Sequence, residues 1–209
     1  KLKLMKANHT SQKYRLETDI AKNYPVQIAA QKEQIAGLRA DREAVKPILE
    51  EKEKDNFSMM IGGKTYTDRK EAGTAILAAC AGLKAVKSNG QIGEFHGFSL
   101  NASYDSFYQT YKLTIKRQCS YQIEIGKDVL GNLQRISNAL TGIEKRLTEA
   151  EQKMENLLSQ LATAQEEVEK PFPKEAELTE KMERLAELNS LLSMDEKGTS
   201  EALGMGEDI

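Results

Sequence analysis

The stretch "LQRISNALTGIEKRLTEAEQKMENLLSQLATAQEEV", residues 133–168, decides the fold of this chain. Apolar residues recur in it at alternating spacings of three and four, a heptad pattern typical of a helix that packs along a partner helix. These positions are Leu133, Ile136, Leu140, Ile143, Leu147, Ala150, Met154, Leu157, Leu161, Ala164 and Val168. The pattern predicts a helix about 50–60 Å long, at 1.5 Å per residue.

The sequence "PFP" at 171–173 should end this helix, because proline lacks the backbone N–H and disfavours helical geometry in the residue before it. A further helix is predicted after it, with an apolar stripe made by Leu178, Met182, Leu185, Leu188 and Leu192. Beyond Met194 the chain is Gly-rich and acidic, which predicts a flexible tail over 195–209.

The first third of the chain offers a partner for the long helix. From Tyr24 onward a weaker heptad seam runs through Ile28, Gln31, Ile35, Leu38, Arg42, Val45 and Leu49. Its polar members, Gln31 and Arg42, are the kind that fix register in a coiled coil. Pro25 should start this helix or kink the chain away from the helix before it, and Pro47 should disturb its last turns. We expect the two seams to pair within one chain; a coiled-coil homodimer is the alternative.

Charge is distributed in a way that suits this pairing. Residues 1–56 carry 12 basic and 9 acidic side chains, residues 57–127 carry 9 and 5, and residues 128–209 carry 9 and 18. A basic first third and an acidic last third favour two antiparallel helical arms.

The middle of the chain, residues 57–127, differs in composition, since it holds five of the seven Tyr and four of the five Phe. "FSMMIGGKTYT", residues 57–67, predicts two short strands around a Gly62–Gly63 turn. A helix capped by Thr67 or Asp68 should follow, and then strands with alternating apolar residues such as Tyr111, Leu113 and Ile115. Four or five antiparallel strands and one helix are expected here.

The predicted fold class is therefore α+β: a long antiparallel coiled-coil helical hairpin with a small antiparallel-sheet-plus-helix module inserted between its arms. The expected boundaries are an N-terminal arm over 1–56, the module over 57–127, a C-terminal arm over 128–194 that breaks at 171–173, and the tail over 195–209.

Sites for catalysis were sought and not found. "GGKT" at 62–65 resembles the end of a phosphate-binding loop, but Ser58 occupies the position of its first glycine, and a charged helix end precedes it where a buried strand is required. His9 is expected in a helix and His96 on a strand, and the carboxylate runs have the spacing of solvated helix faces. The sequence predicts no enzyme, metal or cofactor in this chain.

Nucleic-acid binding is the favoured function. Lys112, Lys116 and Arg117 lie among Tyr104, Phe107, Tyr108, Tyr111 and Tyr121, so cations could contact phosphates while aromatic rings stack on bases. Lys64, Arg69 and Lys70 beside the glycine turn are further candidates for DNA contact, as is Tyr108. The alternative is that the aromatic residues are the core of the sheet and the lysines its solvated face.

The composition also carries expectations about context. The chain lacks a run of about 18 apolar residues, so we expect no membrane span. Two distant cysteines favour the cytoplasm. The chain starts with "KLKLMKANHT" rather than methionine, which suggests a piece excised from a longer protein.

Several stretches resemble a known group of proteins. They are "SQKYRLETDIAKNYPVQIAAQKEQIAG", "IGGKTYTDRKEAGTAIL", "IGEFHGFSL", "GNLQRISNAL" and "EEVEKPFPKEAELTEKMERLAELNSLL". Together they are similar to the C-terminal region of very large proteins of bacterial mobile elements, mainly in Firmicutes. Those proteins join an adenine-specific DNA methyltransferase-like domain to a Swi/Snf-type helicase domain.

The resemblance implies a parent protein that acts on DNA with ATP and S-adenosylmethionine. It carries no catalytic residue over, because the helicase's phosphate loop and D-E-x-x box and the methyltransferase's [DN]-P-P-[YF] motif are missing from this chain. It implies a non-catalytic accessory domain that positions DNA or the neighbouring motor domain. The expected partners are DNA and the catalytic domains of the parent chain. The alternative is a coiled-coil spacer that binds a protein partner or a second copy.

Overall fold

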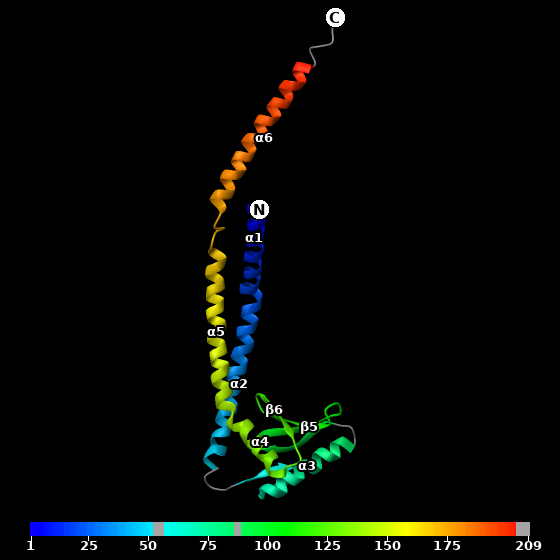
Figure 1. The fold of residues 1–209 in the computed structure, drawn as a ribbon. Helices are drawn as coiled ribbons and strands as arrows, with labels where there is room; N and C mark the ends of the chain where they lie inside the picture. Colours follow the sequence, from blue (N-terminus) through cyan, green and yellow to red (C-terminus); the bar gives the residue numbers. More distant parts are fainter. Residues whose placement is uncertain (52–56, 86–88, 204–209) are drawn as a thin grey trace. The chain divides into compact units, whose positions relative to one another are not determined.

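A computed structural model describes residues 1–51, 57–85 and 89–203 of the chain (Figure 1). It combines helices with a six-stranded antiparallel sheet, so the α+β class is confirmed. The chain divides into two compact units, one formed by 26–158 and the other by 1–25 together with 159–209.

The sheet belongs to the unit formed by 26–158 and has the strand order β2-β1-β3-β4-β5-β6. Neighbouring strands pair antiparallel throughout, so each pair of neighbours except β1 and β3 is a simple hairpin. The strands are β1 (Met59–Ile61), β2 (Lys64–Tyr66), β3 (Gly90–Phe95), β4 (Phe98–Asp105), β5 (Thr110–Lys116) and β6 (Ser120–Ile125). The sheet thus has one or two strands more than the sequence predicted.

One face of the sheet is apolar because side chains alternate between the two faces along each strand. Phe98, Leu100 and Ala102 of β4 and Leu113 and Ile115 of β5 are all buried. Helix α3 (Arg69–Ala85) packs on this core through buried residues at helical spacing. Helix α4 (Val129–Thr141) also joins the core, and Figure 1 shows both helices against the sheet.

The Gly62–Gly63 pair turns the β1–β2 hairpin, as predicted. Gly62 has φ +58° and Gly63 has φ +80°, a backbone conformation that side-chain-bearing residues rarely adopt. The "GGKT" stretch therefore belongs to a hairpin of two strands. A phosphate-binding loop instead lies between a strand and a helix. Asp68 caps the following helix by accepting a hydrogen bond from the backbone N–H of Glu71, 2.8 Å away.

Gly93 lets β1 and β3 approach each other closely. A Cβ atom at this position would lie 2.1 Å from the carbonyl oxygen of Met60. The register between β3 and β4 also shifts between Gln91 and Gly93, so β3 is irregular at the glycine where it approaches β1 closely.

The long C-terminal seam is mostly buried, with Met154, Leu161 and Val168 half-buried, but it is not one helix. Helix α4 ends at Thr141, Gly142 caps it, and α5 (Ile143–Glu169) follows. Leu140 and Ile143 on either side of the break are both almost fully buried. The heptad spacing continues across Gly142 because α4 covers the sheet while α5 packs on another helix, and each needs an apolar face.

That other helix is α2 (Tyr24–Glu51), in the same chain. The Gln31 side-chain amide donates to the carbonyl of Ala150 at 2.9 Å, and Arg42 lies 3.6 Å from the Glu144 carboxylate. Because a higher number on α2 matches a lower number on α5, the contacts run antiparallel.

The seam on α2 was predicted with one error. Gln31, Ile35, Leu38 and Val45 are buried, as expected, but the buried charged side chain is Asp41 rather than Arg42. The helix continues through Pro47 to Glu51, so the expected disturbance does not end it there. The side chain of Leu49 lies outside the described residues.

The other unit contains α1 (Leu2–Thr18), a π-helical turn over Asp19–Asn23, the end of α5, and α6 (Glu175–Leu203). The break over 171–173 is confirmed, since α5 ends at Glu169. The ring of His9 on α1 lies 5.6 Å from that of Phe172, and Lys6 forms an ion pair with Glu175. Leu178 is buried, whereas Leu185, Leu188 and Leu192 are exposed.

The predicted tail is wrong over 195–203, where α6 continues to Leu203; residues 204–209 lie outside the described residues. Among the helices that the structure describes, none combines the length and apolar character needed to cross a membrane.

Candidate nucleic-acid interface

The most exposed aromatic residues of the sheet lie at one of its ends, in the turn that joins β4 to β5. Phe107 and Tyr108 are 83% and 68% exposed, and their ring centroids are 4.8 Å apart. Tyr104 and Tyr111, the last pair but one of the β4–β5 ladder, lie behind them with centroids 5.0 Å apart. With Lys84 and Lys112, these four residues are called the aromatic tip below.

A single carboxylate organises the turn. Oδ1 of Asp105 accepts hydrogen bonds from the backbone N–H groups of Phe107 at 3.0 Å and Tyr108 at 3.1 Å. Such a bond from an aspartate to the backbone two residues ahead is a common way to shape a turn. The other oxygen, Oδ2, accepts from the Lys112 ammonium group at 2.8 Å. The two exposed rings are therefore held by a fixed backbone.

Two lysines place positive charge beside the rings. The Lys84 ammonium nitrogen, at the end of α3, lies 4.3 Å from the centroid of Tyr104, and that of Lys112 lies 5.9 Å from the centroid of Tyr108. The hydrogen bond to Asp105 raises the pKa of Lys112, and contact with the Tyr104 side chain raises the pKa of Lys84. Both lysines are therefore cationic at neutral pH, which is the charge that a phosphate requires.

At the opposite end of the sheet, the turn between β5 and β6 has a different character. Arg117 donates from Nη1 to the carbonyl of Ala40 at 2.9 Å, and the same atom lies 3.8 Å from Asp41. Arg117 is thus bound to α2. Lys116, the last residue of β5, is exposed.

Asp41 is the residue that holds this second turn. Its carboxylate is fully buried and accepts from the backbone N–H groups of Gln118 at 3.0 Å and Cys119 at 2.8 Å, and from the hydroxyl of Tyr121 at 2.7 Å. Tyr121 is 1% exposed, so the prediction that it belongs with the stacking aromatic residues is wrong.

The remaining predicted contacts lie on the edge of the sheet. Lys64 on β2 is exposed, with its ammonium nitrogen 4.8 Å from the centroid of Tyr66. Arg69 and Lys70 begin α3; the Arg69 guanidinium lies 5.5 Å from the centroid of Phe57. The seven candidates thus divide among the β2 edge, the aromatic tip and the β5–β6 turn, and only Tyr108 and Lys112 lie together at the tip.

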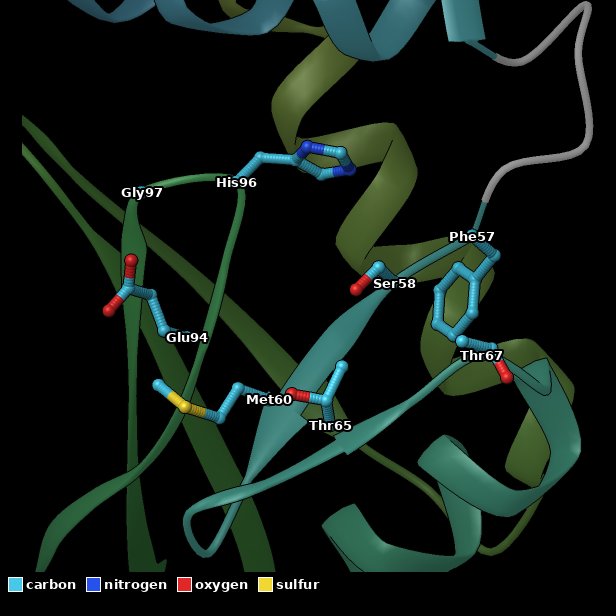
Figure 2. Close-up of a pocket in the computed structure, with 8 residues that line it drawn as sticks. All are labelled: Phe57, Ser58, Met60, Thr65, Thr67, Glu94, His96 and Gly97. Carbon is cyan, nitrogen blue, oxygen red and sulfur yellow. The ribbon is translucent and has the colours of Figure 1, made fainter.

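A cavity of about 600 Å³ opens between the β1–β2 hairpin and the turn that joins β3 to β4 (Figure 2). Figure 2 shows Ser58, Glu94 and His96 around it, with Met60 and Thr65 on its floor. The lining residues are Phe57, Ser58, Met60, Thr65, Thr67, Glu94, His96 and Gly97. None of these described lining residues is Lys or Arg.

The sequence analysis placed His96 on a strand, which is wrong: His96 lies in the turn that joins β3 to β4 and lines that cavity. Its φ of +48°, followed by +77° at Gly97, is the geometry of a two-residue hairpin turn. A histidine in this left-handed region is uncommon but tolerated, and the side chain is half-buried.

Sequence reasoning overlooked Lys84 and Asp105. Lys84 lies at the end of a helix far from β4 along the chain, so no local pattern links it to Tyr104. Asp105 had a usable signal, because an aspartate at the start of "DSFYQT" is typical of a turn.

Within residues 1–51, 57–85 and 89–203, no group of three or more His, Cys, Asp or Glu side chains is placed to hold a metal ion. Neither a family model, nor a curated protein, nor a solved structure matches the chain.

Proposed function

We propose that this chain is a non-catalytic accessory domain that contacts DNA and positions it, or a neighbouring motor domain, within a large DNA-acting protein. The proposal combines the resemblance to methyltransferase–helicase fusions with one observation. Two adjacent aromatic side chains, Phe107 and Tyr108, are exposed on a fixed turn beside a lysine. Rigid exposed rings next to cations are the elements of a surface that stacks on bases and binds phosphates.

The helical segments on either side of the sheet supply the second element of the proposal. We propose that they act as the arms of an antiparallel coiled-coil hairpin with the α+β module inserted between them. The antiparallel contacts of α2 with α5 support this, as do those of α1 with Phe172 and Glu175. The arms would set the distance between the module and the rest of the large protein, and the module would contact the DNA.

The charge of the module limits how DNA is bound. Residues 57–127 carry a net charge of only +4, and Asp105 and Glu124 lie beside Lys112. We therefore expect a modest affinity that depends on a few lysines and falls with salt, because each neutralised phosphate releases counterions.

The test is a fluorescence-anisotropy titration of the chain with single-stranded and duplex DNA at several salt concentrations. Replacing Lys84 and Lys112 together by Ala should lower the slope of log K against log salt by about 2, roughly one per lysine. Lys145→Ala, on α5 with its side chain 83% exposed, is the matched control and should leave the slope unchanged. No binding at low salt would refute the proposal.

A second function has its own supporting observation. Leu185, Leu188 and Leu192 on α6 are exposed on one stripe, although apolar residues at such spacing usually pack on a partner helix. The alternative is therefore a structural spacer that binds a protein partner or a second copy through α6. A dimer in sedimentation equilibrium that dissociates on Leu188→Glu would favour it.

A further inference from the structure

The two rings at the aromatic tip are arranged in a way that narrows the kind of nucleic acid they fit, given the proposed function. The planes of Phe107 and Tyr108 are 84° apart, so one ring meets the other edge-on. Two bases stacked in a strand are parallel to each other. The tip therefore cannot receive two successive bases, one on each ring, and offers a single flat face to a single base.

Phe107 is the ring that presents this face. It is the more exposed of the pair, at 83%, whereas Tyr108 has Lys112 near its ring and Asp105 bonded to its backbone N–H. Both residues of the pair lie within the turn between the ends of two strands, so Phe107 is presented at an apex rather than on a flat surface. An apolar ring at an apex can enter a narrow space that a flat surface cannot.

A tip with one stacking face is poorly suited to follow a long single strand. Proteins that do so combine a continuous positive groove with several aromatic platforms. Here Tyr104 and Tyr111 are half-buried behind the apex with their planes 54° apart, and Asp105 takes part of the charge of Lys112. The remaining positive charge is enough for one or two phosphates beside one base.

A base inside a uniform duplex has both of its faces covered by neighbouring bases, so stacking on it requires those neighbours to separate, which costs a few kcal/mol per step. A base at the end of a duplex, or the first unpaired base at a fork, has one face free. We propose that the aromatic tip recognises such a base: Phe107 stacks on the exposed base at a junction of double- and single-stranded DNA, while Lys84 and Lys112 bind the adjacent phosphates.

The test uses a short forked DNA that carries 2-aminopurine at the first unpaired position. The comparisons are the same duplex with capped ends in place of the arms, and a fork that carries the label at an internal paired position. Stacking on Phe107 should change the 2-aminopurine fluorescence at the fork and leave the internal label unchanged. The fork should bind at least about fivefold more tightly than a duplex with capped ends, since stacking on one base contributes that much or more.

Phe107→Ala and Phe107→Leu should both abolish the fluorescence change and the preference for the fork, because leucine retains apolar volume but has no flat ring. Residual salt-dependent binding should survive in both variants. Tyr14→Ala, on α1 with the ring 71% exposed, is the matched control and should behave as the unchanged chain. Circular dichroism establishes that each variant is folded.

The outcomes separate this inference from the function on which it rests. Salt-dependent binding with equal affinity for fork and duplex, and no response of the label, would overturn the inference and leave the accessory DNA-binding function in place. Absence of any DNA binding would overturn both. A preference for the fork that Phe107→Leu retains would also overturn it, because the recognition would then not depend on the ring.

Discussion

Asp41 and Asp105 do the same work at opposite ends of the sheet, in opposite environments. Each carboxylate accepts two backbone N–H groups of a turn between strands, and each has a third partner: the Tyr121 hydroxyl for Asp41 and the Lys112 ammonium group for Asp105. Asp41 reaches its turn from a separate helix and is fully buried. Asp105 belongs to its own hairpin and lies near the surface.

The difference shows that the same hydrogen bonds from an aspartate to a turn can stabilise the fold at one turn and fix the backbone conformation at another. At the β5–β6 turn the aspartate joins α2 to the sheet, and its partners there are partly or fully withdrawn from solvent. At the β4–β5 turn it fixes a backbone whose side chains remain exposed. Water can replace the carboxylate there at little cost in folding free energy.

The largest effect that would sharpen this comparison is the loss of Asp41. Asp41→Ala leaves two partly buried backbone N–H groups and a buried tyrosine hydroxyl without their acceptor, so we expect the free energy of unfolding to fall by about 3 kcal/mol. Asp105→Ala should lower it much less, because water can replace this carboxylate near the surface. Urea unfolding followed by circular dichroism measures both. Equal losses in the two variants would break the comparison.

Removing the hydroxyl of Tyr121 should have a smaller effect with a distinctive pH dependence. Burial, followed by the hydrogen bond to Asp41, raises the pKa of Tyr121 well above its ordinary value of 10. Above pH 10 the folded chain then binds more protons than the unfolded chain, so stability falls as pH rises, by at most about 1.4 kcal/mol per pH unit. Tyr121→Phe should cost about 1 kcal/mol at neutral pH and flatten this alkaline decline.

Cys80 also contributes to the loss of stability at alkaline pH. Burial raises the pKa of its thiol from 9.0 to about 11, so it adds a decline of the same sign that begins near pH 9. Cys80→Ala should remove this part alone. A slope above pH 10 that is identical in Tyr121→Phe and the unchanged chain would contradict the assignment to Tyr121.

The smallest effect concerns the exposed carboxylate. The hydrogen bond from Lys112, followed by that from the Tyr108 backbone, lowers the pKa of Asp105 below its ordinary value of 3.8. Its stabilising contribution is therefore present above pH 3.8 and is lost as the pH falls through the lowered pKa. Lys112→Met should raise the pKa of Asp105, observed by carbon NMR of the carboxyl group. Lys116→Met, on the same strand, should leave it unchanged.

The sequence allowed the repeating features of the fold to be predicted and missed those that depend on distant partners. The seam from Leu133 to Val168 and the Gly62–Gly63 hairpin follow local rules, and both are present. The break at Gly142 was missed because the apolar spacing continues across it. Six strands form where four or five were expected, because the stretch around His96, read as strand, folds into the separate strands β3 and β4 joined by a turn at His96 and Gly97.

Asp41 shows the limit most clearly. A heptad count leads to Arg42, and nothing in "LRADREAV" marks the neighbouring aspartate as buried. Its three donors come from 118–121, nearly eighty residues away along the chain. At the site, the local composition placed Tyr108 and Lys112 together correctly. It could not show that Tyr121 and Arg117, which are close to them in sequence, lie at the other end of the sheet.

The close approach at Gly93 has a consequence for finding relatives of this chain. No larger residue fits at that position without separating β1 from β3, and the Gly62–Gly63 turn upstream disfavours other residues through its positive φ angles, although its surroundings are open. Substitution elsewhere can erase overall sequence identity while these three positions stay fixed by geometry. A glycine pair followed, one helix later, by a lone glycine within a strand is therefore the trace by which a diverged homologue would be recognised.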